Sequence, residues 1–260
     1  MGASLIAHPS HQMLSRFYCN EQIAVNQTFE LPDNVRHHAV RVLRLKQGDT
    51  IILFNGQGGE FLSEIISINK NTSTLKVFEY NEYECESPLT IELSQAICAN
   101  EKMDWIIQKA VEMGVNRIQP ISTTRGVIKL SSERAVKRRQ HWQQIAIAAC
   151  EQCGRNRLPE ILPPLSLPHW LGKIKKHELS THTNLLLLPT AEQKLSELSE
   201  QPNNPSYTLL IGPEGGFTPE EERAALHTHF VPIRVGKRIL RTESAALATI
   251  AALQTLWGDY

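Results

Sequence analysis

The sequence predicts a two-domain protein of the α/β class, in which a small, mostly β domain precedes a larger α/β domain. Three observations support this prediction. The chain has 260 residues, more than one typical domain of ~100–200 residues needs. Short β-rich runs separated by turn sequences dominate the part before Glu86. From Pro88 onward, apolar strand candidates alternate with longer helical patterns, which is typical of a sheet covered by helices.

The first domain is expected over residues 16–86, after a segment over residues 1–15 that we expect to be mobile and that lacks the pattern of a secretory signal. Turn sequences at Gly56–Gly59 and Asn69–Asn71 separate three predicted strands. These strands are Ile51–Asn55, Phe61–Ile68 and Thr74–Tyr80. A small barrel-like fold accounts for this pattern.

One helix is predicted inside the first domain, ending before the turn Lys46–Asp49. A spacing of 3.6 residues per turn places an apolar set on one side and a basic set on the other. The apolar set is Val35, Ala39, Val42 and Leu43, and the basic set is His37, Arg41 and Arg44. We therefore expect Val42 and Leu43 to be buried and the basic set to face solvent.

The second domain is expected over residues 87–260, with strands and helices in alternation. Gly114 and Gly154 stand where two of its helices should end. Thr218 is a strong helix start, since Pro follows it and Glu221 stands three residues on. The expected strands are Thr90–Cys98, Val115–Ser122, Asn184–Leu188 and Tyr207–Ile211. The expected helices are Met103–Val111, Ser132–Cys153, a helix after Thr218, and about Glu243–Trp257, with Leu162–Leu167 as a surface connector.

The composition excludes several classes of protein. With 41% hydrophobic and 21% charged residues, the chain is not expected to be disordered. The longest aliphatic run, Leu185–Leu188, is far shorter than the ~20 residues of a membrane helix. Five scattered cysteines favour a reducing cytoplasm over a disulfide framework. The 27 Lys and Arg residues balance 27 Asp and Glu residues, yet a local basic face could still bind nucleic acid.

Common catalytic and metal motifs fail on their spacing. The segment Val231–Arg238 lacks the first Gly and the Ser/Thr of a phosphate-binding P-loop, and the glycines of residues 212–216 do not form G-x-G-x-x-G. The chain also lacks H-E-x-x-H and G-x-S-x-G. Cys150 and Cys153 could form a redox pair or half of a zinc site, but both lie on the apolar stripe of a helix, which favours packing. No metal site is expected.

Two segments of the second domain remain as site candidates. Ile211–Phe217 (IGPEGGF) lies between an apolar strand and a well-capped helix, where the backbone of a glycine-rich loop can approach a ligand. A tight turn without a ligand would explain the same residues. Val235–Ala245 brings Lys237, Arg238 and Arg241 close to Glu243 at the start of the last helix, although an ordinary charged helix entry would look alike.

A local excess of positive charge marks the middle of the chain. Between Arg125 and Arg157 stand eight cations against two acids. The cations are Arg125, Lys129, Arg134, Lys137, Arg138, Arg139, Arg155 and Arg157. Together with Arg16 and the stripe His37/Arg41/Arg44, they indicate a surface that could face a polyanion, with a solvated helix face as the alternative.

Taken together, these segments resemble the RsmE family, the bacterial 16S ribosomal RNA uridine N3-methyltransferases of the SPOUT class. The resemblance runs from about Arg16 to Gly258. It is carried in order by Arg16–Tyr18, His37–Arg44, Lys102–Val115, Glu151–Arg155, Ile211–Phe217 and Gly236–Ala245. Val235 and Ser244 depart from the family's usual Leu and Thr, and both replacements are conservative in size.

The resemblance implies a PUA-like β-barrel followed by a SPOUT α/β domain with a trefoil knot. It also implies a cytoplasmic homodimer that uses S-adenosylmethionine (SAM) as its cofactor and acts on 16S rRNA of the small ribosomal subunit. The residues that match the cofactor loops are Leu187, Leu188, Pro189, Ile211, Gly212, Pro213, Glu214, Gly215, Gly216, Arg238, Ile239, Leu240 and Ala245. A last helix that is apolar on nearly all faces would suit both a core and a second subunit, although core burial alone would also explain it.

The implied reaction requires loss of a proton from uridine N3 and alignment with the methyl donor. The groups expected nearest that event are Glu243, Arg241, Arg16 and Glu214. Glu243 would act as a base or orient the uracil, or it would only stabilise the helix start. RNA contacts are expected at Arg16, His37, Arg41, Arg44, Arg125, Arg138, Arg139 and Arg155. The alternatives are a SAM-dependent tRNA methyltransferase and a non-catalytic RNA-binding assembly factor.

Overall fold

The computed structural model describes residues 14–126, 132–174, 182–198 and 205–260. Most of the segment predicted to be mobile, residues 1–15, and the predicted cation Lys129 lie outside the described residues. The chain divides into two compact units. The first unit holds residues 1–85 and also Gly154–Arg157, and the second holds Glu86–Cys153 and Leu158–Tyr260.

A five-stranded sheet forms the first unit, in the order β1-β3-β4-β5-β2. The strands are β1 (Arg16–Tyr18), β2 (Thr28–Glu30), β3 (Thr50–Phe54), β4 (Glu60–Ile68) and β5 (Ser73–Asn81). β1 runs parallel to β3, and the other neighbours are antiparallel. The three strands predicted from the turn sequences are therefore confirmed. Apolar residues alternate with polar ones along β5, since only one face of the sheet covers the core.

The predicted helix of the first unit is wrong in its second half. It begins as α1 (Asp33–Arg36) and continues as a π-helical turn, η1 (His37–Val42). Val35 and Ala39 are buried as expected, but Val42 is 57% exposed and Leu43 is 44% exposed. The wider turn holds one additional residue, and each residue of an α-helix advances by about 100°, so the later apolar residues leave the core face.

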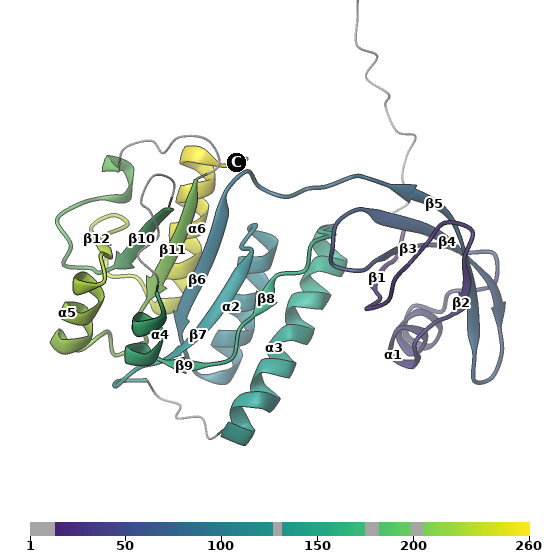
Figure 1. The fold of residues 1–260 in the computed structure, drawn as a ribbon, viewed down its shortest axis with the longest axis horizontal. Helices are drawn as coiled ribbons and strands as arrows, with labels where there is room; N and C mark the ends of the chain where they lie inside the picture. Colours follow the sequence, from purple (N-terminus) through teal and green to yellow (C-terminus); the bar gives the residue numbers. More distant parts are fainter. Residues whose placement is uncertain (1–13, 127–131, 175–181, 199–204) are drawn as a thin grey trace, which may run out of the picture. The chain divides into compact units, whose positions relative to one another are not determined.

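The second unit contains a parallel sheet in the order β12-β10-β11-β6-β7-β8, with β9 pairing with β7 (Figure 1). Its strands are β6 (Thr90–Ala96), β7 (Arg117–Ser122), β8 (Glu160–Ile161), β9 (Leu165–Ser166), β10 (His182–Leu187), β11 (Ser206–Ile211) and β12 (Val231–Ile233). The four predicted strands are confirmed as β6, β7, β10 and β11. The chain passes from β11 to β12 across β10. Because β10 is parallel to both β11 and β12, the carboxyl ends of these three strands meet at one edge of the sheet.

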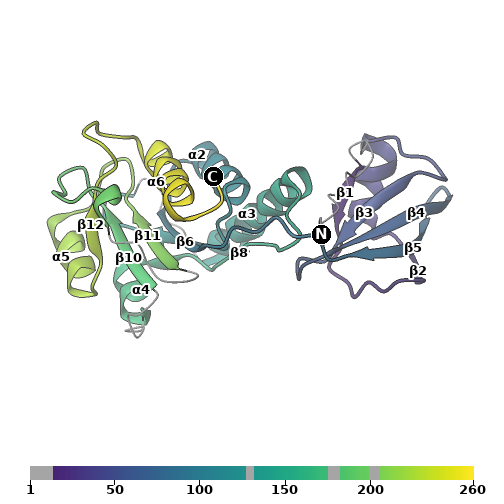
Figure 2. The same cartoon turned by 90° about the horizontal axis from the view of Figure 1, so that it is seen from above.

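Helices cover both faces of this sheet (Figure 2). One face carries α2 (Asn100–Glu112), α3 (Ser132–Cys153) and α6 (Thr242–Trp257), and the other carries α4 (Leu167–Lys173) and α5 (Pro219–His227). Gly114 and Gly154 adopt positive φ angles of 88° and 89° just after α2 and α3, as their helix-ending positions predict. Thr218 caps α5, accepting a hydrogen bond from the amide of Glu221 at 3.2 Å. None of the helices that the structure describes is long and apolar enough to cross a membrane.

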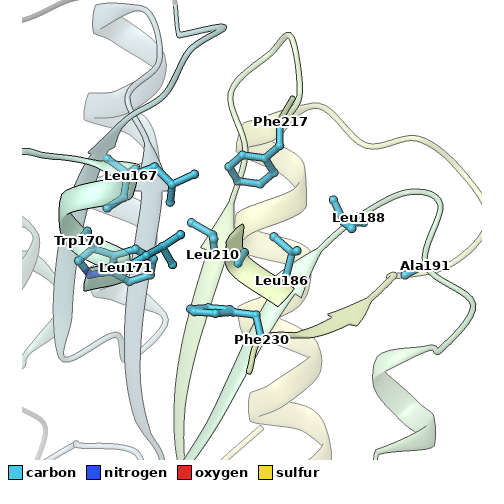
Figure 3. Close-up of a cluster of buried hydrophobic side chains, with 11 residues drawn as sticks. Leu167, Trp170, Leu171, Leu186, Leu188, Ala191, Leu210, Phe217 and Phe230 are labelled. Atoms are coloured by element: carbon cyan, nitrogen blue, oxygen red, sulfur yellow. The ribbon is translucent and has the colours of Figure 1, made fainter. Parts of the chain in front are cut away.

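The surface connector predicted at Leu162–Leu167 is wrong in part. Leu165–Ser166 forms β9, and Leu167 is only 1% exposed in an apolar cluster beneath α4 and α5 (Figure 3). Prolines and strands of two or three residues give no periodic signal, which explains why this region and β12 have no recognisable pattern in the sequence. Figure 3 also shows Phe217, from the loop after β11, pointing into this cluster. The glycine-rich loop is therefore fixed to the core at its end.

Candidate functional site

A pocket of about 670 Å³ lies where β10, β11 and β12 end and α6 begins. Three segments form most of its wall: the end of β10 with Leu188–Pro189, the loop after β11, and residues 234–242 with Ala245. All thirteen residues that the resemblance matched to the cofactor loops line this pocket. These residues are far apart in sequence, and the crossing of β11 to β12 over β10 brings them together.

A buried polar network forms the base of the pocket. The hydroxyl of Thr242, at the start of α6, donates a hydrogen bond of 2.6 Å to the carbonyl oxygen of Gly212. The side-chain amide of Gln95, at the end of β6, donates to the same hydroxyl at 2.9 Å. Three elements are thus joined at one oxygen atom. Neither Thr242 nor Gln95 stands out in the sequence, because a polar residue at a helix start or a strand end has no local pattern that reveals its partner.

The glycine-rich loop is also held from its outer side. The guanidinium of Arg125 donates to the carbonyl oxygens of Gly215 at 3.1 Å and Phe217 at 3.2 Å. Gly216 adopts a φ of +67°, which a residue with a side chain rarely tolerates. A Cβ atom at Gly212 would lie 3.1 Å from the ring of Phe217. Arg125, predicted to bind RNA, therefore shapes the pocket wall in this structure, and its RNA contact stays a prediction.

Lys102 bridges two acidic residues at the pocket. Its ammonium lies 3.3 Å from Glu214 Oε1 and 3.8 Å from Glu243 Oε2. The three side chains are 33%, 27% and 18% exposed, so the group is partly shielded from water. Glu243 Oε2 is buried and accepts no hydrogen bond from the residues that the structure describes. Lys102 and Glu214 line the pocket, and Glu243 lies behind them, outside the lining.

Glu243 forms its ion pair with a residue that the sequence did not single out. The ion pair that the structure gives Glu243 is with Lys102, and Arg241 lies exposed on the pocket wall before α6. Lys102 was not among the predicted site residues. It opens the segment Lys102–Val115 that carried part of the resemblance, and that was the available signal.

Arg16 lies in the first unit, where its side chain is 12% exposed and its two terminal nitrogens donate to acceptors, while Nε has no partner among the residues that the structure describes. It forms an ion pair with Glu60 at 2.5 Å and donates to Asn156 Oδ1 at 2.5 Å and to the Gly154 carbonyl at 3.2 Å. The ring of Phe54 lies 5.2 Å beneath the guanidinium carbon. These contacts give Arg16 a structural task within the first unit. Its predicted roles in catalysis and RNA binding stay predictions.

The other residues predicted to bind RNA differ in their exposure. His37, Arg41 and Arg44 are exposed on and after the π-helical turn. Arg138 and Arg139 are half-buried on α3, and Arg139 donates to the Ile161 carbonyl at 2.8 Å. Arg155 is only 3% exposed, so an RNA contact there would require its side chain to move. Of these, the cluster on the π-helical turn is the one most accessible to a polyanion.

Among the described residues, no group of three or more His, Cys, Asp or Glu side chains is placed to hold an ion. Cys150 is buried and Cys153 is half-buried on α3, in agreement with packing. Cys98 lies beside Thr242, and burial raises the pKa of its thiol to about 11. The thiol is therefore neutral near pH 7 and does not contribute a charge to the pocket.

Comparisons with known proteins cover both units. A family model described as an RNA methyltransferase domain matches residues 85–254, and one described as an RNA methyltransferase PUA domain matches residues 31–78. "Ribosomal RNA small subunit methyltransferase E" of Buchnera aphidicola subsp. Schizaphis graminum is 38% identical, covering 95% of this chain and 98% of that protein. The protein of the same name from Bacillus subtilis is 30% identical, covering 90% and 92%.

A solved structure shares the fold. The crystal structure of a ribosomal RNA small subunit methyltransferase E from Neisseria gonorrhoeae, bound to S-adenosyl methionine, superposes with a TM-score of 0.87 at 38% identity. The match covers 95% of this chain and 99% of that one. Similarity therefore extends over both units.

Proposed function

We propose a specific reaction for this chain, which belongs to the family of ribosomal RNA small subunit methyltransferase E: transfer of a methyl group from SAM to N3 of a uridine in 16S rRNA. The observation that carries the proposal is the convergence of the three cofactor-loop segments on one pocket. Because a solved relative at 38% identity binds SAM, the same ligand is expected here.

The pocket fits SAM in size and in chemistry. Its volume of about 670 Å³ lies within the ~300–1,000 Å³ that small-molecule sites occupy. Leu187, Ile211 and Leu240 form apolar walls that suit the adenine ring of SAM. The backbone of the glycine-rich loop offers hydrogen-bonding groups for the polar atoms of SAM. Glu214 adds negative charge near a ligand that carries a positive sulfur. SAM, when bound there, supplies an electrophilic methyl group.

The side chains beside the pocket suit removal of the proton from uridine N3. The Oε2 of Glu243, which accepts no hydrogen bond from the described residues, can accept the N3–H once the side chain turns toward the pocket, either directly or through a water molecule. The Lys102 ammonium, 3.8 Å from this oxygen, can stabilise negative charge that develops on the uracil carbonyls. Lys102 also holds Glu214 and so keeps both carboxylates in place. This assignment adds Lys102 to the predicted residues and keeps Glu243 and Glu214.

We also propose that the enzyme acts as a cytoplasmic homodimer and that its second unit contains a trefoil knot. Supporting the dimer, α6 buries Ala246, Ile250 and Leu253, while Leu247, Ala248 and Ala251 remain partly exposed on the other side of the same helix. Small apolar side chains on a second face allow close packing of another subunit. Light scattering at micromolar concentration should give a dimeric mass, and a monomeric mass would refute the dimer.

The reaction is tested with purified full-length protein and SAM carrying a labelled methyl group. We expect label to enter 16S rRNA or small ribosomal subunits, and digestion with mass analysis should identify the product as 3-methyluridine. Transfer to tRNA instead would support the first alternative. Saturable RNA binding without SAM binding or methyl transfer would support a non-catalytic assembly factor.

A further inference from the structure

Two apolar side chains of the first unit point outward from the segment where a regular helix would bury them. Val42 is 57% exposed and Leu43 is 44% exposed, although they share the predicted helix with the buried Val35 and Ala39. We call them the Val42–Leu43 pair. A single exposed apolar residue is common on protein surfaces. Two adjacent ones that a local distortion turns outward indicate an interaction site.

The distortion is a π-helical turn that is anchored on both sides. The amide of Leu43 donates to the carbonyl oxygen of His38 at 3.0 Å, which is the wide hydrogen bond of such a turn. Before it, Val35 and Ala39 are 5% and 0% exposed in the core of the sheet, and after it Leu45 packs against the same core. The pair is therefore held outward by fixed neighbours on either side.

Backbone strain accompanies this turn. Arg44 adopts a φ of +56°, one of three positive values among the non-glycine residues that the structure describes. A left-handed arginine costs free energy, since its Cβ crowds the backbone. Both π-helical turns and strained residues occur preferentially at functional sites. Arg44 and the Val42–Leu43 pair are thus displayed by the same irregular segment.

The stretch of sequence that contains the pair is basic, with one acidic residue at each boundary, Asp33 and Asp49. Residues 34–48 contain four Lys or Arg, two His and no acidic residue. Arg41 and Arg44, which flank the pair in sequence, are both exposed. A surface of apolar side chains between arginines is complementary to a nucleic acid, which offers apolar base faces between phosphates. A second protein chain would need compensating acids opposite these cations.

We propose that the Val42–Leu43 pair contacts the faces of unpaired bases in the RNA substrate, while Arg41 and Arg44 bind the flanking phosphates. The inference rests on the proposed function, which makes RNA the partner. Bases within an A-form duplex are stacked and inaccessible to such side chains, whereas unpaired bases can pack against them. The pair therefore favours single-stranded or bulged RNA over duplex RNA. The two arginines raise the affinity for either form, because both forms present phosphates.

The test uses full-length protein with Val42→Ser and Leu43→Ser combined, and two probes: a single-stranded oligouridine and a fully paired RNA duplex. We expect about 5-fold weaker binding to the single strand, at the low end of the roughly 5- to 150-fold that a base stacked on an aromatic ring contributes, because Val and Leu are aliphatic, and no change on the duplex. The slope of log affinity against log salt should stay unchanged, because no cation is removed. Arg41→Gln with Arg44→Gln should instead flatten that slope by about 0.7 per contact on the single strand.

Leu226→Ser is the matched control, because Leu226 is 43% exposed on α5 and should not alter RNA affinity. Melting temperature and SAM affinity report the integrity of each variant, and Val42→Ala serves if the double variant does not fold. Wild-type affinity of the double variant for the oligouridine would overturn the inference. So would an equal loss on both probes, or a changed oligomeric mass with RNA affinity intact.

The failure of this inference differs from a failure of the proposed function. Wild-type protein that binds oligouridine through the pair but never methylates rRNA would leave the inference standing and remove the function. Normal methylation of rRNA by the double variant, with unchanged affinity for oligouridine, would support the proposed function and overturn the inference.

Discussion

The hydroxyl of Thr242 donates a hydrogen bond of 2.6 Å to the carbonyl oxygen of Gly212, across thirty positions of sequence. The bond ties the start of α6 to the loop that follows β11, and Gln95 of β6 donates to the same hydroxyl. The pocket wall is therefore set by a buried side chain that does not itself react.

Replacing Thr242 by Val should destabilise the protein and weaken cofactor binding. The change keeps the shape of the side chain but leaves the Gly212 carbonyl and the Gln95 amide without their shared partner, which costs about 1–3 kcal/mol. Thr242→Ser, which retains the hydroxyl, is the control. Thermal unfolding and calorimetric titration with SAM measure both effects. Equal SAM affinity in the Val and Ser variants would show that the bond does not shape the pocket.

Substitution of Gly216 should weaken SAM binding more than it weakens the fold. The φ of this residue is +67°, and an added Cβ would meet no atom within 4 Å, so Gly216→Ala introduces backbone strain of about 1–2 kcal/mol and no clash. Gly172→Ala is the matched control, since its Cβ also meets open space and its φ is not positive. Gly212→Val is a poorer test, because the new side chain would strike Phe217. SAM titration of Gly216→Ala with wild-type affinity would contradict the expectation.

Glu243→Gln separates a catalytic carboxylate from one that only stabilises the start of α6. If Glu243 accepts the N3 proton, kcat at saturating SAM and RNA should fall by about 10²–10⁴, with little change in melting temperature. A helix-end charge alone would cost about 0.3–1 kcal/mol of stability and leave turnover near normal. Normal turnover with a lowered melting point would move the search for the base to Glu214.

Lys102→Met should lower kcat more than it raises the KM for RNA, since the ammonium is expected to stabilise charge that develops only during the reaction. Lys102→Arg keeps the charge and should restore part of the rate. Lys109→Met is a control on the same helix, because Lys109 pairs with Glu112 and does not line the pocket. A KM effect alone in Lys102→Met would indicate substrate binding rather than catalysis.

The stability of the second unit should fall at high pH because of Cys98. Burial raises the pKa of this thiol from about 9 to about 11, so the folded state retains a proton that the unfolded state loses. The resulting stability is fully present below pH 9 and is lost between about pH 9 and pH 11, at up to about 1.4 kcal/mol per pH unit. Cys98→Ala should flatten this part of the curve of unfolding free energy against pH, with Cys153→Ala as the control. An unchanged curve in Cys98→Ala would contradict this origin.

The sequence by itself determined most of the secondary structure, and its resemblance to a known family named thirteen residues that line one pocket. Local patterns predicted α2, α3, three strands of the first sheet (β3, β4 and β5) and four of the second (β6, β7, β10 and β11), and the cap at Thr218 located α5, because these signals act over a few neighbouring residues. The glycine-rich loop Ile211–Phe217 was recognisable for the same reason. Its local residues suffice to specify a turn after a buried strand.

The tertiary structure alone decided which distant groups meet. The order β12-β10-β11-β6 brings three loops to one pocket, and it places Lys102 of α2 between Glu214 and Glu243. In the first unit, tertiary packing placed Arg16 against Glu60 and Asn156. A π-helical turn directs Val42 and Leu43 outward. Periodicity describes neighbours along one element, whereas ion pairs, buried hydroxyl partners and a shift of helical phase depend on packing between elements, which no local pattern encodes.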